Sequence, residues 1–243
     1  MAELKCPDMI GRSTEQAKLQ KAVDRNRAQI VVVYGRRRVG KTFLVNEFFS
    51  NSYAFKHTAV SPESSTTQKG LMKIQLQEFH YSLRMYGLAP EISCPNSWSD
   101  AFHLLQQLLD SKNDGGNQVI FIDELPWMDT PRSGFLPAFE HFCNDWCLAR
   151  KHVKLIVCGS ATSWIVDEML DSKGGLYDRV TTPIYVKSFT LGECREYFKS
   201  EGFNMDEYDM VLAYMAFGGI PFYLSQFDND LSVAQNIDAI LFA

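Results

Sequence analysis

Three largely apolar runs constrain the fold of this chain most: QIVVVY at 29–34, VIFI at 119–122 and VKLIVC at 153–158. None of them shows the alternation of apolar and polar residues that a half-exposed strand requires. Strands that are apolar throughout are buried on both faces, and they belong to parallel sheets covered by helices on each side. We therefore predict an α/β fold with a parallel sheet, which strand-like segments at 53–60 and 181–186 extend.

Helical patterns separate these strands, and the pattern changes near residue 188. Helices are expected at about 13–26, 41–49, 66–86, 99–112, 134–151 and 162–170. Beyond that point only helical segments follow, beginning with a capping box of Thr190 and Glu193. We divide the chain into an α/β core (1–187) and a small helical lid subdomain (188–243). The last helical stretch is apolar and carries no capping signal, which favours the front part of a longer protein with a further C-terminal domain.

The composition limits the class of protein. Hydrophobic residues make up 46% and charged residues 22% of the chain, as in soluble globular proteins. The net charge of -5 argues against a strongly basic nucleic-acid-binding surface. The sequence has neither a signal peptide nor an apolar run of about 18 residues, so no membrane span is expected. Its six scattered cysteines are typical of reduced thiols, and we expect a cytoplasmic protein.

The pattern Gly35-x-x-x-x-Gly40-Lys41-Thr42 follows the first apolar strand and precedes a helix. Backbone N–H groups at such a helix start bind phosphate, the lysine reaches the β- and γ-phosphates, and the threonine hydroxyl holds Mg²⁺. This Walker A pattern predicts an ATP- or ADP-binding loop. Its candidate nucleotide-binding residues are Gly35, Arg38, Val39, Gly40, Lys41, Thr42 and Phe43.

Three consecutive arginines, 36–38, occupy variable positions of this loop. A solvated loop face explains them better than three additional phosphate ligands. A contact of one of them with nucleotide or with a partner stays open.

An acid pair ends the apolar run VIFI. Asp123 is expected to position Mg²⁺ through water, as the Walker B acid, and Glu124 to orient and deprotonate the attacking water. The alternative for Glu124 is a solvated carboxylate at a strand end. Ser160 follows the next apolar strand, and it either touches the γ-phosphate or attacking water or caps the next helix, for which Thr162 is the better candidate.

Four further segments carry a resemblance to a known family: MIGRSTE (9–15), FIDELPWM (121–128), GGLYDRVTTPIYVKSFTLGE (174–193) and GGIPFYL (218–224). Together with the loop, they resemble P-loop ATPases of the AAA+ superclass. More narrowly, they are similar to the archaeal-type ATPase family of the STAND group of signal-transducing ATPases. The resemblance spans about residues 9–243 in the right order. Members of that family usually continue into a C-terminal domain, often nuclease-like, which is missing here.

The resemblance implies further site residues. Ile10, Gly11 and Arg12 would lie by the adenine and ribose, and the lid proline Pro221 would pack near the adenine. Arg12 also has an alternative as an ordinary surface or helix-capping arginine. Arg179 stands at the family's arginine position, and three roles stay open for it. It would act on a neighbour's γ-phosphate in a homo-oligomer, act as a sensor in its own chain, or form a salt bridge with a local acid such as Asp178.

The lid offers no arginine that matches the second sensor of ordinary AAA+ enzymes, since Arg195 is its only arginine and lies early in its first helix. This departure favours a nucleotide-dependent switch with slow ATP hydrolysis. A non-hydrolysing scaffold that carries bound ADP or ATP is the first alternative, and a small-molecule phosphotransferase is the second.

Other classes of site fit less well. Cys143 and Cys147 share a helix face with histidines nearby, but an aromatic stripe explains this helix as core, so zinc is not favoured. No guanine-reading motif is present, which favours adenine. Trp127 and Trp164 are expected in core or interface packing rather than in base stacking.

Overall fold

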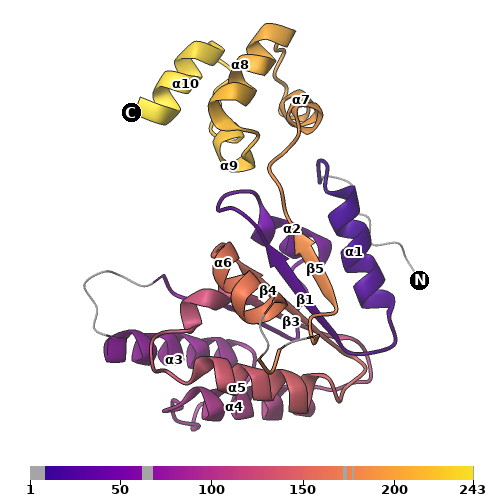
Figure 1. The fold of residues 1–243 in the computed structure, drawn as a ribbon, viewed down its shortest axis with the longest axis vertical. Helices are drawn as coiled ribbons and strands as arrows, with labels where there is room; N and C mark the ends of the chain where they lie inside the picture. The colour runs from indigo at the N-terminus through magenta and orange to yellow at the C-terminus, as the bar shows by residue number, and fades with distance from the viewer. Residues whose placement is uncertain (1–8, 62–67, 172–173, 177, 243) are drawn as a thin grey trace.

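The computed structural model describes residues 9–61, 68–171, 174–176 and 178–242, and its centre is a five-stranded sheet (Figure 1). The order across the sheet is β2-β3-β4-β1-β5, and all neighbouring strands run parallel. The strands are β1 (Gln29–Tyr34), β2 (Phe55–Thr58), β3 (Gln118–Asp123), β4 (Val153–Gly159) and β5 (Thr182–Tyr185). The prediction of an α/β fold with a parallel sheet is confirmed.

Helices cover both faces of this sheet. They are α1 (Ser13–Asp24), α2 (Lys41–Phe48), α3 (Gln68–Met85), α4 (Trp98–Ser111), the 3₁₀ helix η1 (Leu125–Met128), α5 (Phe135–His141), the π-helical η2 (Phe142–Cys147), α6 (Thr162–Trp164) and the π-helical η3 (Ile165–Leu170). Within β1, Ile30 and Val32 belong to the apolar core under α3, α4 and α5, whereas Val31 and Val33 belong to the core under α1 and α2. This strict alternation explains why the strand is apolar throughout.

The strand predicted at 53–60 is present as β2, over the shorter range Phe55–Thr58. Beyond its end, the side chain of Gln75 bonds both backbone groups of Val60 (Gln75 Nε2 to the carbonyl, 2.7 Å; Val60 N to Gln75 Oε1, 3.2 Å) in place of a sheet partner. One expectation about local structure is wrong. Thr162 does not cap α6 but is its first residue, and the N-cap position belongs to Ala161.

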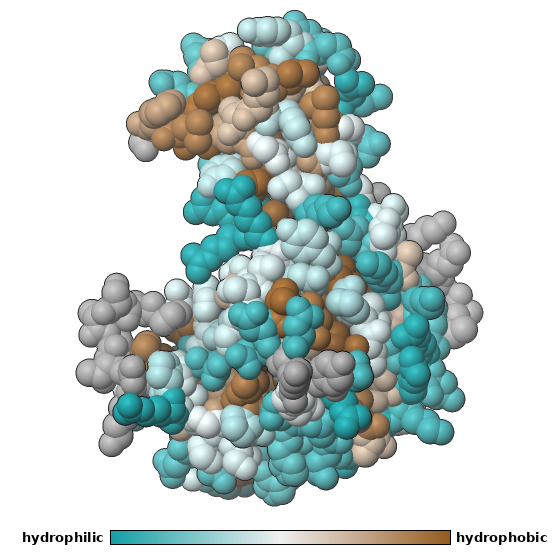
Figure 2. Space-filling model, viewed as in Figure 1, coloured by the Kyte–Doolittle hydropathy of each residue, from teal (hydrophilic) through white to brown (hydrophobic). Residues whose placement is uncertain are grey.

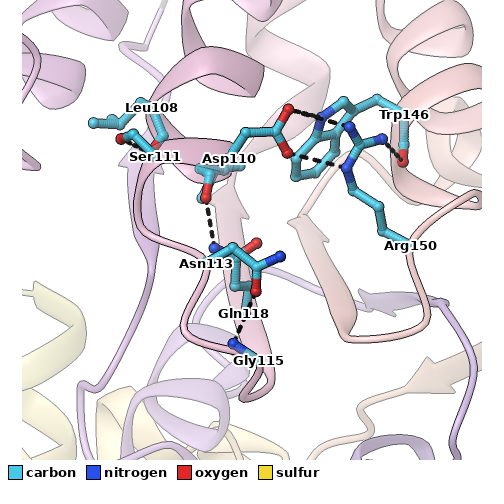
Figure 3. Close-up of polar contacts among 9 residues, drawn as sticks. Leu108, Asp110, Ser111, Asn113, Gly115, Gln118, Trp146 and Arg150 are labelled. Atoms are coloured by element: carbon cyan, nitrogen blue, oxygen red, sulfur yellow. Dashed lines mark hydrogen bonds and ion pairs between the residues drawn. The ribbon is translucent and has the colours of Figure 1, made fainter.

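A polar cluster fastens α4 to η2 at the end of the molecule remote from the C-terminus (Figures 1 and 3). Arg150 donates to both carboxylate oxygens of Asp110 at 3.1 Å, and Trp146 Nε1 donates to the same carboxylate at 3.2 Å. The Arg150 guanidinium also lies 4.4 Å from the centroid of the Trp146 ring. The cluster closes the edge of the aromatic core that fills this side of the sheet.

The last four helices are α7 (Leu191–Ser200), α8 (Glu207–Phe217), α9 (Pro221–Leu224) and α10 (Val233–Phe242). They pack around an apolar cluster of their own and follow β5 through an extended stretch (Figure 1). The expected capping box of Thr190 and Glu193 is present at the start of α7. Hydrophobic residues also gather on the visible face of these helices (Figure 2). The large side chains that these helices expose include Tyr208 and Met215 on α8. Within the described parts of the chain, no helix is long and apolar enough to cross a membrane.

His57 on β2 makes stability depend on pH. Its Nδ1 lies 2.9 Å from Ser82 Oγ, and that hydroxyl donates to the Glu78 carbonyl, so Nδ1 carries the proton of the neutral ring. Burial lowers the pKa of His57 from 6.5 to about 4. Below pH 6.5 the unfolded chain therefore binds a proton that the folded chain does not accept until about pH 4.

We predict that the free energy of unfolding falls between pH 6.5 and pH 4, by an amount that reaches roughly 3 kcal/mol from this residue. His57→Gln should be less stable at pH 7 but should lose less stability over this interval. Urea unfolding at a series of pH values measures the difference, with the exposed His103→Gln as control. Parallel pH profiles of wild type and His57→Gln would contradict the assignment.

Candidate functional site

The loop between β1 and α2 has a shape that two glycines permit. A Cβ on Gly35 would lie 2.3 Å from the carbonyl oxygen of Val186, so no side chain fits there. Gly40 precedes α2 at φ 87°, and no atom lies within 4 Å of the place where its Cβ would be. The first N–H groups of α2 have no partner inside the helix, and they open onto this free space. Such a helix start suits an anion.

Lys41 lies back over the same loop. Its Nζ donates to the carbonyls of Gly35 (3.0 Å) and Arg36 (2.9 Å), and the side chain is buried. These carbonyls hold the ammonium beside the helix start, where it would meet a phosphate. The residue types and their placement therefore fit a phosphate chain.

A hydroxyl and a carboxylate meet next to the lysine. Thr42 Oγ1 donates to Asp123 Oδ2 at 2.8 Å, and the other oxygen of Asp123 accepts from the backbone N–H of Glu124 at 3.0 Å. Asp123 is 4% exposed. Hard oxygen ligands of this kind are those that Mg²⁺ prefers, so the pair fits the expected metal position.

The carboxylate of Glu124 accepts hydrogen bonds from Ser160, so it is not simply a solvated carboxylate at a strand end. Its Oε2 accepts from the backbone N–H (3.0 Å) and from the hydroxyl (2.9 Å) of Ser160, at the end of β4. The backbone of Glu124 has φ 50°, a left-handed conformation that non-glycine residues rarely adopt and that gathers at functional sites. The helix-capping alternative for Ser160 is wrong, because its hydroxyl is directed to Glu124 and α6 has no side-chain cap.

The N-terminal segment reaches the loop through Arg12. Its Nη2 donates to the carbonyl of Val39 at 3.0 Å, and its guanidinium lies 4.8 Å from the centroid of Phe189, in the stretch before α7. The residue is 7% exposed, so the alternative of an ordinary surface arginine is wrong. Burial lowers the pKa of Arg12, and the carboxylates of Glu15 and Glu193 counter that effect. The side chain therefore joins three segments of the chain.

A cavity of about 740 Å³ lies between the loop and the C-terminal helices. The predicted site residues on its wall are Ile10, Arg12, Arg38, Val39, Gly40, Lys41, Thr42, Phe43, Glu124 and Pro221. Sequence reasoning did not assign Trp127, Phe189 and Phe222 to the site, and they also line the cavity. Arg37, for which it left a nucleotide contact open, lies on the same wall. Trp127 is half-buried on this wall, whereas Trp164 donates from Nε1 to Asp129 at 2.9 Å. No sequence pattern distinguishes such a wall residue from a core tryptophan.

Arg179 lies elsewhere. It is exposed and does not line the cavity, so a sensor role within its own chain is not supported in this conformation. Among the ion pairs of the described residues, none joins it to Asp178.

Comparisons with known proteins agree with this geometry. A family described as an ATPase domain predominantly from Archaea matches residues 9–227. The chain belongs to this family. An uncharacterised protein of Methanocaldococcus jannaschii is 25% identical to this ATPase domain over 218 residues, which are 89% of this chain and 43% of the relative. An uncharacterised ATP-binding protein of the same organism is 40% identical over 42 residues, or 17% of this chain and 71% of that protein.

The chain thus spans less than half the length of the longer relative. Solved structures share the fold of the ATPase domain. A Walker-type ATPase of Pyrococcus abyssi has a TM-score of 0.64 at 17% identity and covers 98% of this chain and 74% of its own. A signal transduction ATPase with numerous domains and a tetratricopeptide repeat sensor, from Pyrococcus horikoshii, has a TM-score of 0.54 at 16% identity. The match covers 97% of this chain and 33% of that protein. The expected family and its P-loop fold are confirmed.

We predict that Arg12→Ala lowers the free energy of unfolding by roughly 1.5–3 kcal/mol, because it removes a charged donor from a buried carbonyl. The exposed ion pair of Arg195 with Glu207 gives the control, since Arg195→Ala should change stability by less than about 0.5 kcal/mol. Chemical denaturation of both variants measures the effect. Equal midpoints for the two variants would remove Arg12 from this structural role.

Proposed function

We propose that the chain binds ATP with Mg²⁺ in this cavity, hydrolyses it slowly, and uses its nucleotide state to set the position of the C-terminal helices, residues 188–243, as a lid. One observation carries the proposal. Lys41, Thr42, Asp123 and Glu124 meet at the start of α2, and the C-terminal helices form the opposite wall of the same cavity. A ligand that fills the cavity contacts both walls, so its presence favours one lid position over another.

Each side chain has a role in this proposal. Lys41 exchanges the carbonyls of Gly35 and Arg36 for the β- and γ-phosphates, and Thr42 and Asp123 hold Mg²⁺, which supplies positive charge to the phosphates. Glu124 takes a proton from the attacking water. The water oxygen forms a bond to the γ-phosphorus, the bond from that phosphorus to the β–γ bridging oxygen breaks, and ADP and phosphate leave.

Slow turnover is supported by two features. Glu124 holds two hydrogen bonds from Ser160 and has to turn away from them to reach a water molecule. The described lid residues on the cavity wall include no arginine, because Arg195 forms an ion pair with Glu207 at 2.5 Å. A cation on the lid that would stabilise the charge of the transition state is therefore missing from this wall.

Arg38 joins the loop to the lid. Its Nη1 donates to the hydroxyl of Tyr223 at 2.7 Å, and its guanidinium lies 4.4 Å from the centroid of Phe222. The backbone N–H of Phe222 also donates to the Arg38 carbonyl at 3.4 Å. When the loop changes its conformation around bound phosphates, Arg38 moves with it and displaces α9. This connection supports a nucleotide-dependent switch.

A scaffold that keeps bound nucleotide without hydrolysis uses the same cavity, and it is the second candidate. It is favoured by the hydrogen bond from Ser160 to Glu124, because a carboxylate held in this way is less free to accept a proton from water. We also propose that the switch acts on a partner domain in a longer protein. In a homo-oligomer, Arg179 would contact the nucleotide of a neighbouring copy. Turnover by the wild-type chain separates the two candidates.

We predict that Lys41→Ala weakens ATP binding at least 100-fold, because it removes the ammonium that meets the phosphates. Isothermal titration calorimetry with MgATP measures this, and Lys73→Ala, an exposed lysine on α3 outside the cavity wall, serves as control. An unchanged affinity would place the nucleotide elsewhere.

Glu124→Gln should keep MgATP affinity within about three-fold and lower the turnover number about 10²–10⁴-fold, the usual contribution of a general base. Phosphate release measured over a wide range of protein concentrations makes the comparison. Full turnover in this variant would exclude Glu124 as the base, and absent turnover in wild type would favour the scaffold.

Tyr223→Phe should leave MgATP affinity nearly unchanged and reduce the effect of ATP on the lid, because it removes only the hydroxyl that Arg38 holds. Hydrogen exchange of the α9 and α7 amides with and without nucleotide measures this effect. Tyr208→Phe is the matched control, since that side chain is 75% exposed on the lid. An identical ATP response in Tyr223→Phe and wild type would show that this contact does not transmit the change.

A further inference from the structure

We propose that Arg37 contacts the terminal phosphate of ATP within its own chain, and that it distinguishes ATP from ADP and stabilises the charge that develops in hydrolysis. The inference rests on the proposed function, because it assigns one more residue to that site. It gives the loop a cation that the lid wall lacks.

The position of Arg37 differs from that of its two neighbours. Arg37 lines the cavity together with Lys41, Thr42 and Glu124. Arg38 is bound to Tyr223 on α9. Arg36 does not line the cavity, and its carbonyl only accepts from Lys41.

The contacts of Arg37 place it beside the proposed base. Its Nε donates to Ser160 Oγ at 3.4 Å, and that hydroxyl donates to the Glu124 carboxylate at 2.9 Å. The guanidinium also lies 5.7 Å from the centroid of the Trp127 ring. An arginine at this place is separated from the base of the reaction by a single side chain.

Among the residues that the structure describes, no carboxylate forms an ion pair with Arg37. Its hydrogen bond to Ser160 is long, at 3.4 Å. A guanidinium has five N–H donors in a planar fork that matches phosphate oxygens, so most of its donors remain available. The side chain is exposed and long enough to turn, and a γ-phosphate bound by Lys41 would be the strongest acceptor near it.

The same movement affects Glu124. In the chain Arg37–Ser160–Glu124, donation from Arg37 polarises the hydroxyl and strengthens its bond to the carboxylate. When Arg37 turns to the phosphate, Ser160 holds Glu124 less firmly. Arrival of a third phosphate therefore loosens the base, whereas ADP leaves this chain of hydrogen bonds in place.

The test compares Arg37→Ala with Arg84→Ala, an exposed arginine on α3 outside the cavity wall. We expect Arg37→Ala to weaken binding of the non-hydrolysable analogue ADPNP at least 10-fold and to change ADP affinity by less than two-fold, because only the analogue has a γ-phosphate. Turnover should fall on the order of 10²-fold, as when one donor to a developing charge is removed. Arg37→Lys should recover part of the ADPNP affinity, and Arg84→Ala should behave as wild type in every assay.

Equal losses of ADPNP and ADP affinity in Arg37→Ala, or no loss of either, would overturn the inference while the proposed function stands. A wild-type chain that binds neither nucleotide would instead overturn the proposed function and the inference with it. Mixing Arg37→Ala with Lys41→Ala chains tests whether the residue acts within its own chain. We expect no recovery of turnover in the mixture, and recovery would assign Arg37 to a neighbouring copy.

Discussion

Burial of β1 and β4 on both faces is the constraint on which the rest of this structure depends. Strands in that position require crossover helices on each side, and those crossovers make all five strands parallel. The carboxyl ends of β1, β3 and β4 then meet at one edge of the sheet. The glycine loop leaves from the first of these ends, Asp123 and Glu124 from the second and Ser160 from the third, so the hydrogen bonds among them follow from the topology.

The C-terminal helices depend on this edge in a different way. They bury an apolar cluster of their own. Among the described residues, Arg38 provides hydrogen bonds that join them to the rest of the chain, with Tyr223 and Phe222. The backbone N–H of Phe189, in the stretch before α7, donates to the Gly219 carbonyl at 2.7 Å. Arg12 packs on the ring of Phe189, and Arg38 donates a hydrogen bond to Tyr223. A unit with its own core and a small polar junction can turn without losing its packing, which supports the lid that we propose.

Three neighbouring arginines show how much the fold adds to a sequence. Arg36, Arg37 and Arg38 are identical in chemistry, and the sequence favours a solvated loop face for them while leaving open a contact of one of them with nucleotide or a partner. In the structure one lies off the cavity, one stands beside Ser160, and one is held by the lid. The backbone conformation of the loop, including φ 70° at Arg38, sends the three side chains in different directions.

The sequence by itself determined the parallel sheet, the glycine loop before α2, the acid pair at the end of β3 and the family, because each of these depends on local patterns: apolar runs, glycine spacing and residues at strand ends. The tertiary structure alone decided that Ser160 holds Glu124 rather than a helix, that Arg12 is buried, that Arg179 lies off the cavity, and that Trp127 lines it. These outcomes depend on distances between segments far apart in the chain. A pattern within one segment carries no information about such distances, since they are fixed only when strands and helices pack.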